Sequence, residues 1–255
     1  MGKPVAGLQM YSVRDEAERD LLGTLEKVAE MGYKAVETIG YFNAPPSLLK
    51  RKLDELGLVA PSAFVSLNFK TLGKLGKDFA KDIEAAGLLG VSYIVVPWVP
   101  MQEQPSMEDV KFLSDVLIRC GEQTREAGMK LVLHNHDYEF KLVDGKPAID
   151  RILELVPPAL MDMELDLGWI FMAGYDPAEY LLKHKSRVPL VHLRDFKQGR
   201  KDTEIGTGVV DYDRLLKAVD EAEVEYMYVE QEHFADNSLN SAMANMIYLK
   251  KMGYC

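Results

Sequence analysis

The stretch LVLHNHDYEF, residues 131–140, decides how this chain is expected to fold. Three apolar residues, which suit a buried strand, run directly into a polar cluster that contains His134, His136 and Glu139. The whole chain has five histidines, and two of them lie here, one residue apart. An apolar strand that ends in such groups is typical of parallel α/β folds, in which the carboxyl ends of the strands carry the functional side chains.

The same alternation of a short β-rich run and a longer helical pattern continues on both sides of this stretch. The expected strands cover residues 4–10, 34–39, 58–67, 91–98, 130–135, 159–166, 188–195 and 226–232. The expected helices cover 21–32, 45–57, a segment ending near 87, then 107–128, 147–155, 176–185, 211–222 and 238–252. Eight strand–helix units in 255 residues, with no linker between them, predict an α/β protein that forms a (β/α)8 TIM barrel as a single domain, residues 1–255. An open doubly wound sheet is the main alternative, but the GxGxxG pattern that often follows its first strand is absent.

The composition excludes several classes of protein. Forty acidic and 30 basic residues give a formal charge of −10, and such a surface repels phosphate backbones, so we expect no nucleic-acid partner. No apolar run approaches the roughly 20 residues of a membrane helix, so no membrane association is expected. The first residues do not read as a signal peptide, and two cysteines suggest no disulfide framework. We therefore predict a cytoplasmic protein, and a homo-oligomer is possible although no contact patch can be identified.

Side chains of the kind that bind metals stand at the predicted strand ends. In chain order they are Glu37, His134, His136, Asp166, His192, Glu230 and Glu232. All of these ends meet at one mouth of a barrel. Buried carboxylates and imidazoles are costly unless they are paired or coordinated, and several of them together would repel one another without a cation. Carboxylates and imidazoles without thiolates suit one divalent ion, which could be Mn²⁺, Mg²⁺, Co²⁺, Fe²⁺ or Zn²⁺.

Each of these residues also has a simpler interpretation. A single histidine at a strand end is more often only hydrogen-bonded, Asp166 could cap a turn, and Glu230 could be an ion-pair partner. The clustering at four successive strand ends favours the metal site over these separate explanations.

Several motifs occur in the order found in a known family. They are GLQMYSVRDE, HNHDYEF, LDLGW with GYDP, VHLRDF, GTGVVDY and YVEQE, and they span nearly the whole chain. The chain resembles the sugar phosphate isomerase/epimerase family of xylose isomerase-like TIM barrels. The resemblance implies a metal held by two glutamates, an aspartate and a histidine at the ends of strands five to eight. Asp166, His192 and Glu230 match three of these positions.

The fourth position departs from the family pattern. His134 stands where the first glutamate is expected, so the implied metal set is His134, Asp166, His192 and Glu230, with Glu139 or His136 as alternatives to His134. Many relatives place a histidine near the position of Trp169, which suits a sugar ring better than a metal.

The activity implied by this site is that of a metal-dependent isomerase or epimerase acting on a keto-sugar or polyol. The ion would polarise a carbonyl and acidify the adjacent C–H, and a base would move that proton. The candidate bases are His136, Glu139 and Glu232. If loss of a β-hydroxyl or glycosyl group followed proton removal, the protein would instead be a dehydratase or lyase. A non-catalytic sugar-binding barrel with a degraded site is the alternative from another class.

Other residues near the strand ends are candidates for binding the sugar. They are Tyr11, Arg14, Glu37, Ser66, Asn68, Trp98, Trp169, Arg194 and Lys197. Aromatic faces pack against sugar C–H groups while polar groups recognise hydroxyls. Trp98 and Trp169 could instead cap the barrel core, and solvated surface charge is the commoner explanation for Arg194 and Lys197. No glycine-rich phosphate loop is present, so a phosphorylated substrate is not predicted.

Overall fold

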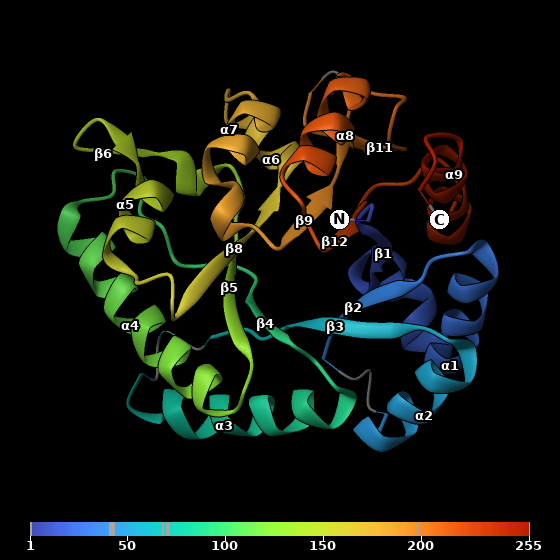
Figure 1. Ribbon diagram of the computed structural model, residues 1–255, viewed down its shortest axis with the longest axis horizontal. Helices are drawn as coiled ribbons and strands as arrows, with labels where there is room; N and C mark the ends of the chain where they lie inside the picture. Colours follow the sequence, from blue (N-terminus) through green and yellow to red (C-terminus); the bar gives the residue numbers. More distant parts are fainter. Residues whose placement is uncertain (1, 41–43, 68, 70–71, 198, 255) are drawn as a thin grey trace.

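A computed structural model describes residues 2–40, 44–67, 69, 72–197 and 199–254, and in it eight parallel strands close into a barrel with helices outside (Figure 1). The strand order around the barrel is β1-β12-β9-β8-β5-β4-β3-β2. The barrel strands are β1 (Val5–Gln9), β2 (Ala35–Ile39), β3 (Val59–Phe64), β4 (Tyr93–Val96), β5 (Lys130–His134), β8 (Met161–Asp166), β9 (Leu190–Leu193) and β12 (Tyr226–Val229). The predicted (β/α)8 barrel is therefore confirmed.

The predicted helices follow the strands, and one additional short helix, α6, precedes α7. They are α1 (Arg14–Met31), α2 (Pro46–Leu56), α3 (Leu72–Leu89), α4 (Met107–Glu126), α5 (Ala148–Leu155), α6 (Leu167–Met172), α7 (Pro177–His184), α8 (Tyr212–Glu221) and α9 (Ser238–Lys251). Local signals set their ends: Ser106 and Asp109 form a capping box that begins α4. Gly57 ends α2 with a φ of 66°, which glycine adopts without strain.

The first helix begins earlier than predicted, at Arg14 rather than near residue 21. Asp20 leaves the helical conformation (φ −154°, ψ 88°), and its side chain accepts a hydrogen bond from the backbone N–H of Gly23. Asp20 thus caps a second helical segment, and the apolar period of the sequence identified only that segment.

The interior of the barrel changes from apolar to polar along the strands. Alternate residues of a strand point to the same side. The inner apolar cluster holds Ala35, Val95, Val132, Leu190 and Tyr228. On four strands, the residue two positions after a member of this cluster is ionisable and buried. The polar mouth of the barrel is therefore built on an apolar plug, while a second and larger core lies between strands and helices.

Short elements at the polar mouth were not predicted. The 3₁₀ helices η1 (Met10–Val13) and η3 (Tyr138–Phe140) follow β1 and β5 there, whereas a further unpredicted 3₁₀ helix, η4 (Lys185–Arg187), lies between α7 and β9 at the opposite end of the barrel. Helix α6 begins directly after Asp166. Two small hairpins are added, one of β6 (Leu142–Val143) and β7 (Lys146–Pro147), the other of β10 (Asp195–Phe196) and β11 (Asp202–Thr203).

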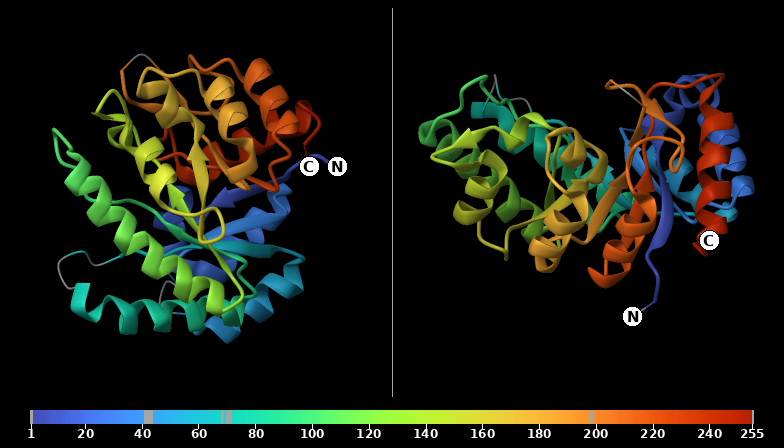
Figure 2. Two further views of the ribbon diagram at one scale, coloured as in Figure 1. Left: turned by 60° about the vertical axis from the view of Figure 1, so that its left-hand side comes forward. Right: turned by 90° about the horizontal axis from the view of Figure 1, so that it is seen from above.

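The ends of the described chain meet beside α9. Lys3 Nζ lies 4.1 Å from the centre of the Tyr254 ring, and both views of Figure 2 show the two termini near each other. None of the helices in the described part of the chain has the length and hydropathy that a membrane crossing requires.

Candidate metal centre and active site

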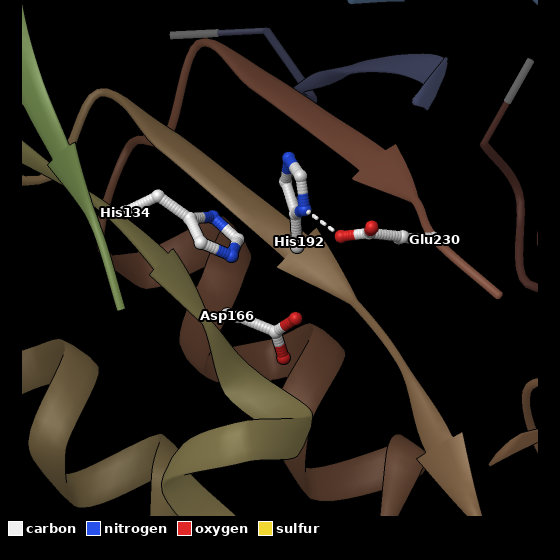
Figure 3. A group of neighbouring side chains, drawn as sticks. All are labelled: His134, Asp166, His192 and Glu230. Carbon is white, nitrogen blue, oxygen red and sulfur yellow. Dashed lines mark hydrogen bonds and ion pairs between the residues drawn. The ribbon is translucent and has the colours of Figure 1, made fainter. Parts of the chain in front are cut away.

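Four side chains from successive strand ends converge at the polar mouth. His134 ends β5, Asp166 ends β8, His192 lies on β9 and Glu230 follows β12. One potential ligand atom from each lies within 4.8 Å of those of the others, and all four residues are buried (Figure 3). Residues nearly one hundred positions apart in the chain are thus adjacent because consecutive barrel strands end at one rim.

His192 is held from both sides of its ring. Nδ1 lies 2.7 Å from Glu230 Oε2, and Nε2 lies 2.8 Å from Glu37 Oε2. Glu164 Oε1 is a further 3.3 Å contact of Nε2. Burial lowers the pKa of His192, but the carboxylates of Glu164 and Glu37 outweigh burial and raise the pKa well above its ordinary value.

His134 has the opposite electrostatic environment. Its Nδ1 lies 3.1 Å from Glu164 Oε2. Burial, reinforced by the neighbouring His192 and His136, lowers the pKa of His134 well below its ordinary value. A neutral imidazole is the form that binds a metal, so this environment suits a ligand.

Arg194 forms the cationic part of the site. Its guanidinium is buried and contacts carboxylates of Asp166 (3.0 Å), Asp202 (2.9 Å), Glu230 (2.9 Å) and Glu232 (2.9 Å). The interpretation of Arg194 as solvated surface charge is therefore wrong: its charge is compensated internally, which permits burial. Arg194 was also a candidate for binding the sugar, but it is buried and is not among the residues that line the cavity described below.

The pKa values of the two acids in the cluster are shifted in opposite directions. Burial raises the pKa of Asp166 to about 6, although Arg194 acts in the other direction. For Glu230, Arg194 and His192 outweigh burial and lower the pKa well below its ordinary value. The donor set therefore comprises one neutral imidazole, one histidine between carboxylates and two carboxylates.

The donor atoms fit a divalent ion. Two imidazoles and two carboxylates without a thiolate are a set that suits first-row divalent ions such as Mn²⁺, Fe²⁺, Co²⁺ and Zn²⁺. Asp166 Oδ1 also accepts a hydrogen bond from the backbone N–H of Trp169, which fixes the carboxylate at the start of α6. Buried oxygens without a hydrogen-bond partner, Glu37 Oε1 and Glu164 Oε1, lie beside this set. These residues would hold one metal in the way that the sequence predicts.

A cavity of about 480 Å³ opens above the cluster. Its lining comprises Tyr11, Ile39, Gly40, Phe64, Ser66, Pro97, Trp98, His134, His136, Tyr138, Glu230 and Glu232. A volume of this size is typical of a small-molecule site. Aromatic faces and proton-carrying groups thus share one chamber with two members of the metal cluster.

The candidate bases are not equally placed. His136 and Glu232 line the cavity, whereas Glu139 is fully buried and is not among the lining residues. Glu139 Oε2 accepts a hydrogen bond from the backbone N–H of His136, and burial raises the pKa of Glu139 to about 8. The structure therefore places Glu139 as a support of the His136 backbone. Glu232 lies beyond the end of β12 and not on the strand as predicted, because β12 ends at Val229, while His136 follows β5, which ends at His134.

The predicted sugar-binding residues also separate into two groups. Tyr11, Ser66 and Trp98 line the cavity. Glu37 does not, because it is fully buried beneath the cluster. Arg14 stacks 4.0 Å from the centre of the Tyr11 ring, so it supports a lining residue.

The centre of the Trp169 ring lies 5.2 Å from the guanidinium carbon of Arg194 and 4.9 Å from that of Arg200. Lys197 is exposed, and Asn68 lies outside the described residues.

Two functional positions were missed from the sequence. Glu164 is fully buried and contacts both His134 and His192. The two-residue period of a strand would have found it, because Glu164 shares a face with Asp166. Asp202 accepts hydrogen bonds from Arg194 and from the backbone N–H of Glu232, and it lies on a hairpin that no pattern predicted.

Comparison with known proteins places the chain in a family. The model of the xylose isomerase-like TIM barrel family matches residues 25–252. The inosose dehydratase of Geobacillus kaustophilus is 31% identical over 191 residues, which cover 68% of this chain and 61% of that protein. The inosose dehydratase of Clostridium perfringens is 26% identical over 263 aligned positions, covering 89% of this chain and 88% of that protein.

Solved structures show the same fold. A sugar phosphate isomerase/epimerase from Parabacteroides distasonis superposes with a TM-score of 0.86 at 24% identity, covering 98% of this chain and 94% of that chain. The IOLI protein, solved with a bound zinc atom, gives a TM-score of 0.80 at 16% identity, with 96% and 97% covered. From the family model and the closed eight-stranded barrel, the chain belongs to the xylose isomerase-like TIM barrel family.

Proposed function

We propose that this chain is a divalent-metal-dependent dehydratase that acts on a cyclic keto-polyol of the inosose type. The observation that carries the proposal is the convergence of His134, Asp166, His192 and Glu230 at the floor of a cavity of about 480 Å³. The inosose dehydratases among the relatives favour dehydration over the isomerase or epimerase activity that the sequence motifs imply. The intact donor set argues against a non-catalytic barrel with a degraded site.

The four converging side chains hold the metal in this proposal. When bound, a divalent ion polarises the substrate carbonyl and thereby acidifies the neighbouring C–H. Arg194 keeps Asp166 in place with a charge-assisted hydrogen bond and Glu230 with an ion pair.

Glu232 is the residue we assign to proton transfer. It lines the cavity, and Arg194 bonds to its Oε1, which orients the carboxylate. Glu232 takes the proton from the carbon next to the carbonyl, the C–O bond to the β-hydroxyl breaks, and a double bond forms between the two carbons. The proton on Glu232 then passes to the departing hydroxyl, so the products are an unsaturated ketone and water.

His136 binds substrate hydroxyls in this arrangement. Its ring stacks on Tyr138 at 5.0 Å, and its Nδ1 lies 3.1 Å from the Tyr138 hydroxyl. Burial lowers the pKa of His136 to about 4, so its imidazole is neutral near pH 7 and can exchange hydrogen bonds with a neutral polyol. Trp98 and Phe64 supply the apolar wall against the ring C–H groups.

The test is an assay of the purified protein with an inosose, with and without added Mn²⁺, Co²⁺ or Zn²⁺, in D₂O. We expect metal-dependent formation of the dehydrated ketone. Glu232→Gln should lower kcat by about 10²–10⁴-fold, because the proton acceptor is removed, while metal binding is retained. Glu225→Gln is the matched control, since Glu225 is exposed at the opposite end of β12 and contacts Tyr93 there.

Other outcomes would contradict the proposal. Deuterium incorporation with an isomeric product but no loss of water would identify an isomerase or epimerase. Binding of the polyol by the metal-loaded protein with neither exchange nor turnover would identify a non-catalytic sugar-binding barrel.

A further inference from the structure

We infer that Glu164 and Glu37 are positioning residues that make the two histidines of the metal cluster bind through different ring nitrogens, Nε2 for His134 and Nδ1 for His192. This inference rests on the proposed metal site, but it does not depend on which substrate the site takes. It concerns two carboxylates that lie under the cluster and are not among the residues that line the cavity: Glu164 contacts His134 and His192, and Glu37 contacts His192.

The orientation of His192 follows from its neighbours. One ring nitrogen, Nδ1, faces Glu230 at 2.7 Å, and the other points away from Glu230 (Figure 3). That other nitrogen, Nε2, lies 2.8 Å from Glu37 Oε2. Because Glu230 and Asp166 stand on the Nδ1 side, Nδ1 presents its lone pair to the metal and Nε2 donates its hydrogen to Glu37.

His134 is held in the reverse sense. Its Nδ1 lies 3.1 Å from Glu164 Oε2, so Nδ1 donates and Nε2 is left for the metal. The two imidazole rings lie 4.6 Å apart at an interplanar angle of 61°. With opposite tautomers they offer lone pairs to one point from two directions.

Glu164 is shared between the histidines. Oε2 accepts from His134, and Oε1 is 3.3 Å from His192 Nε2 but has no hydrogen bond of its own. A single carboxylate from the middle of β8 therefore fixes the relative placement of ligands from β5 and β9. Removing this acceptor should weaken both ligands together, because a hydrogen bond from one ring nitrogen to a carboxyl oxygen raises the basicity of the opposite ring nitrogen.

Glu37 is itself fixed by its surroundings. Gln9 Nε2 donates to Glu37 Oε2 at 2.6 Å, and Gln9 Oε1 accepts from the backbone N–H of Tyr11. Gln9, Glu37 and Glu164 are all fully buried. The barrel interior thus holds both carboxylates in one orientation each.

The same three groups could in principle hold a second cation, since ligand atoms of Glu37, Glu164 and His192 also lie within 4.8 Å of one another. His192 Nε2 and Glu37 Oε2 lie 2.8 Å apart, which is the separation of a hydrogen bond, so the contact is explained without an ion. The number of Zn²⁺ equivalents that the protein binds distinguishes hydrogen-bonded positioning by Glu37 from a second cation site.

The first experiment uses the unmodified protein loaded with Zn²⁺, a diamagnetic ion. Long-range ¹H–¹⁵N correlation spectra of the histidine side chains report which nitrogen carries the hydrogen. We expect Nδ1–H for His134 and Nε2–H for His192, with one equivalent of Zn²⁺ bound. The same tautomer at both residues, or a second equivalent bound tightly, would overturn the inference.

The second experiment measures Zn²⁺ affinity by competition with a chelator, and the absorption spectrum of the Co²⁺ form. Glu164→Met, which keeps a similar volume but has no carboxylate, should weaken binding by about 10–100-fold. Glu164→Gln keeps an acceptor for His134 Nδ1 and should fall between Glu164→Met and the unmodified protein. Glu37→Gln should change the Co²⁺ spectrum and weaken binding in the same direction.

Ser62→Ala is the matched control. Ser62 is fully buried and donates to the hydroxyl of Tyr228 rather than to a histidine, so its loss should leave the affinity unchanged. Equal affinities of the unmodified protein and the two Glu164 variants would show that Glu164 is only packing. These readouts report the metal site alone, so a failed dehydratase assay with the expected tautomers would reject the substrate and not the positioning.

Discussion

Arg194 contacts two carboxylates that also belong to the candidate metal site. Arg194 Nε contacts Asp166 Oδ2 and its Nη2 contacts Glu230 Oε2, and both acids belong to the metal cluster. The arginine therefore compensates negative charge that would otherwise repel within a buried site. Arg194 Nη1 also contacts Asp202 and Glu232, so the compensation of charge extends to Glu232, the residue proposed for proton transfer.

We predict that Arg194→Met destabilises the metal-free protein by about 3–5 kcal/mol, because it leaves several buried carboxylates without a cation. Saturating Zn²⁺ should restore part of the lost free energy of unfolding, since an ion at the cluster supplies the missing positive charge. Urea unfolding with and without Zn²⁺ measures both values.

Arg187→Met is the control for this prediction. Arg187 pairs with Asp162 at the opposite end of β8, so its loss should destabilise the protein by an amount that Zn²⁺ does not alter. An Arg194→Met protein as stable as the unmodified one would contradict the compensating role.

Helices α5 and α7 are joined by one carboxylate. Asp150 on α5 accepts a hydrogen bond from the Tyr180 hydroxyl and another from Lys183 Nζ at 2.7 Å, both on α7. Burial raises the pKa of Asp150, but its contacts with His184, Lys183 and Tyr180 outweigh burial and lower the pKa below its ordinary value. The link therefore depends on the ionised form of Asp150.

This link predicts a pH-dependent contribution to stability. Because the folded-state pKa of Asp150 is lower than the unfolded value of about 3.9, its contribution is present above that value and is lost as the pH falls towards the folded-state pKa. Asp150→Asn should lower the free energy of unfolding by about 1–3 kcal/mol at pH 7. The difference in free energy of unfolding between the unmodified protein and Asp150→Asn should become smaller below about pH 4.

Denaturant unfolding of both proteins between pH 7 and pH 3 tests the sign. Glu179→Gln is a suitable control, because Glu179 is an exposed carboxylate on α7 whose ion pair with Arg214 should contribute little. A difference that grows on acidification would refute the assignment.

Closure of the barrel depends on a residue without a side chain. Gly7 on β1 lies opposite Tyr228 of β12 and Ala35 of β2. A Cβ at Gly7 would approach the Tyr228 ring to 2.5 Å and the carbonyl oxygen of Ala35 to 3.0 Å. Strands β12 and β2 can therefore flank β1 closely only because this position is glycine.

Gly7→Ala should destabilise the protein by about 1–3 kcal/mol through overpacking of the barrel interior. Gly87→Ala should be neutral or stabilising by up to about 1 kcal/mol, since Gly87 lies in α3 and a Cβ there meets only Met129 at 3.9 Å. Thermal unfolding of the two variants separates the effects. Equal melting temperatures for both variants would argue against a close β1–β12 contact.

The local patterns of the chain, together with the family resemblance, were sufficient to predict the architecture and the side chains that form the candidate metal site. Short segments carry the patterns that were used. These patterns are the two-residue period of strands, the 3.6-residue period of helices, and Asp, His or Glu at the strand ends. The eight units and the cluster of His134, Asp166, His192 and Glu230 were predicted on that basis, with the family resemblance, and the structure brings the four residues together.

The arrangement around these ligands depends on contacts between distant segments. Glu37 touches His192 across 155 positions, and Glu164 joins His134 to His192. The burial of Arg194 likewise depends on acids from β8, β11 and the segment after β12. Strand order, register and closure set such pairs, and no short segment encodes them. For this reason the sequence named the groups of the site, while the assembled barrel determined which of them face the metal cluster, which face the cavity and which support the others.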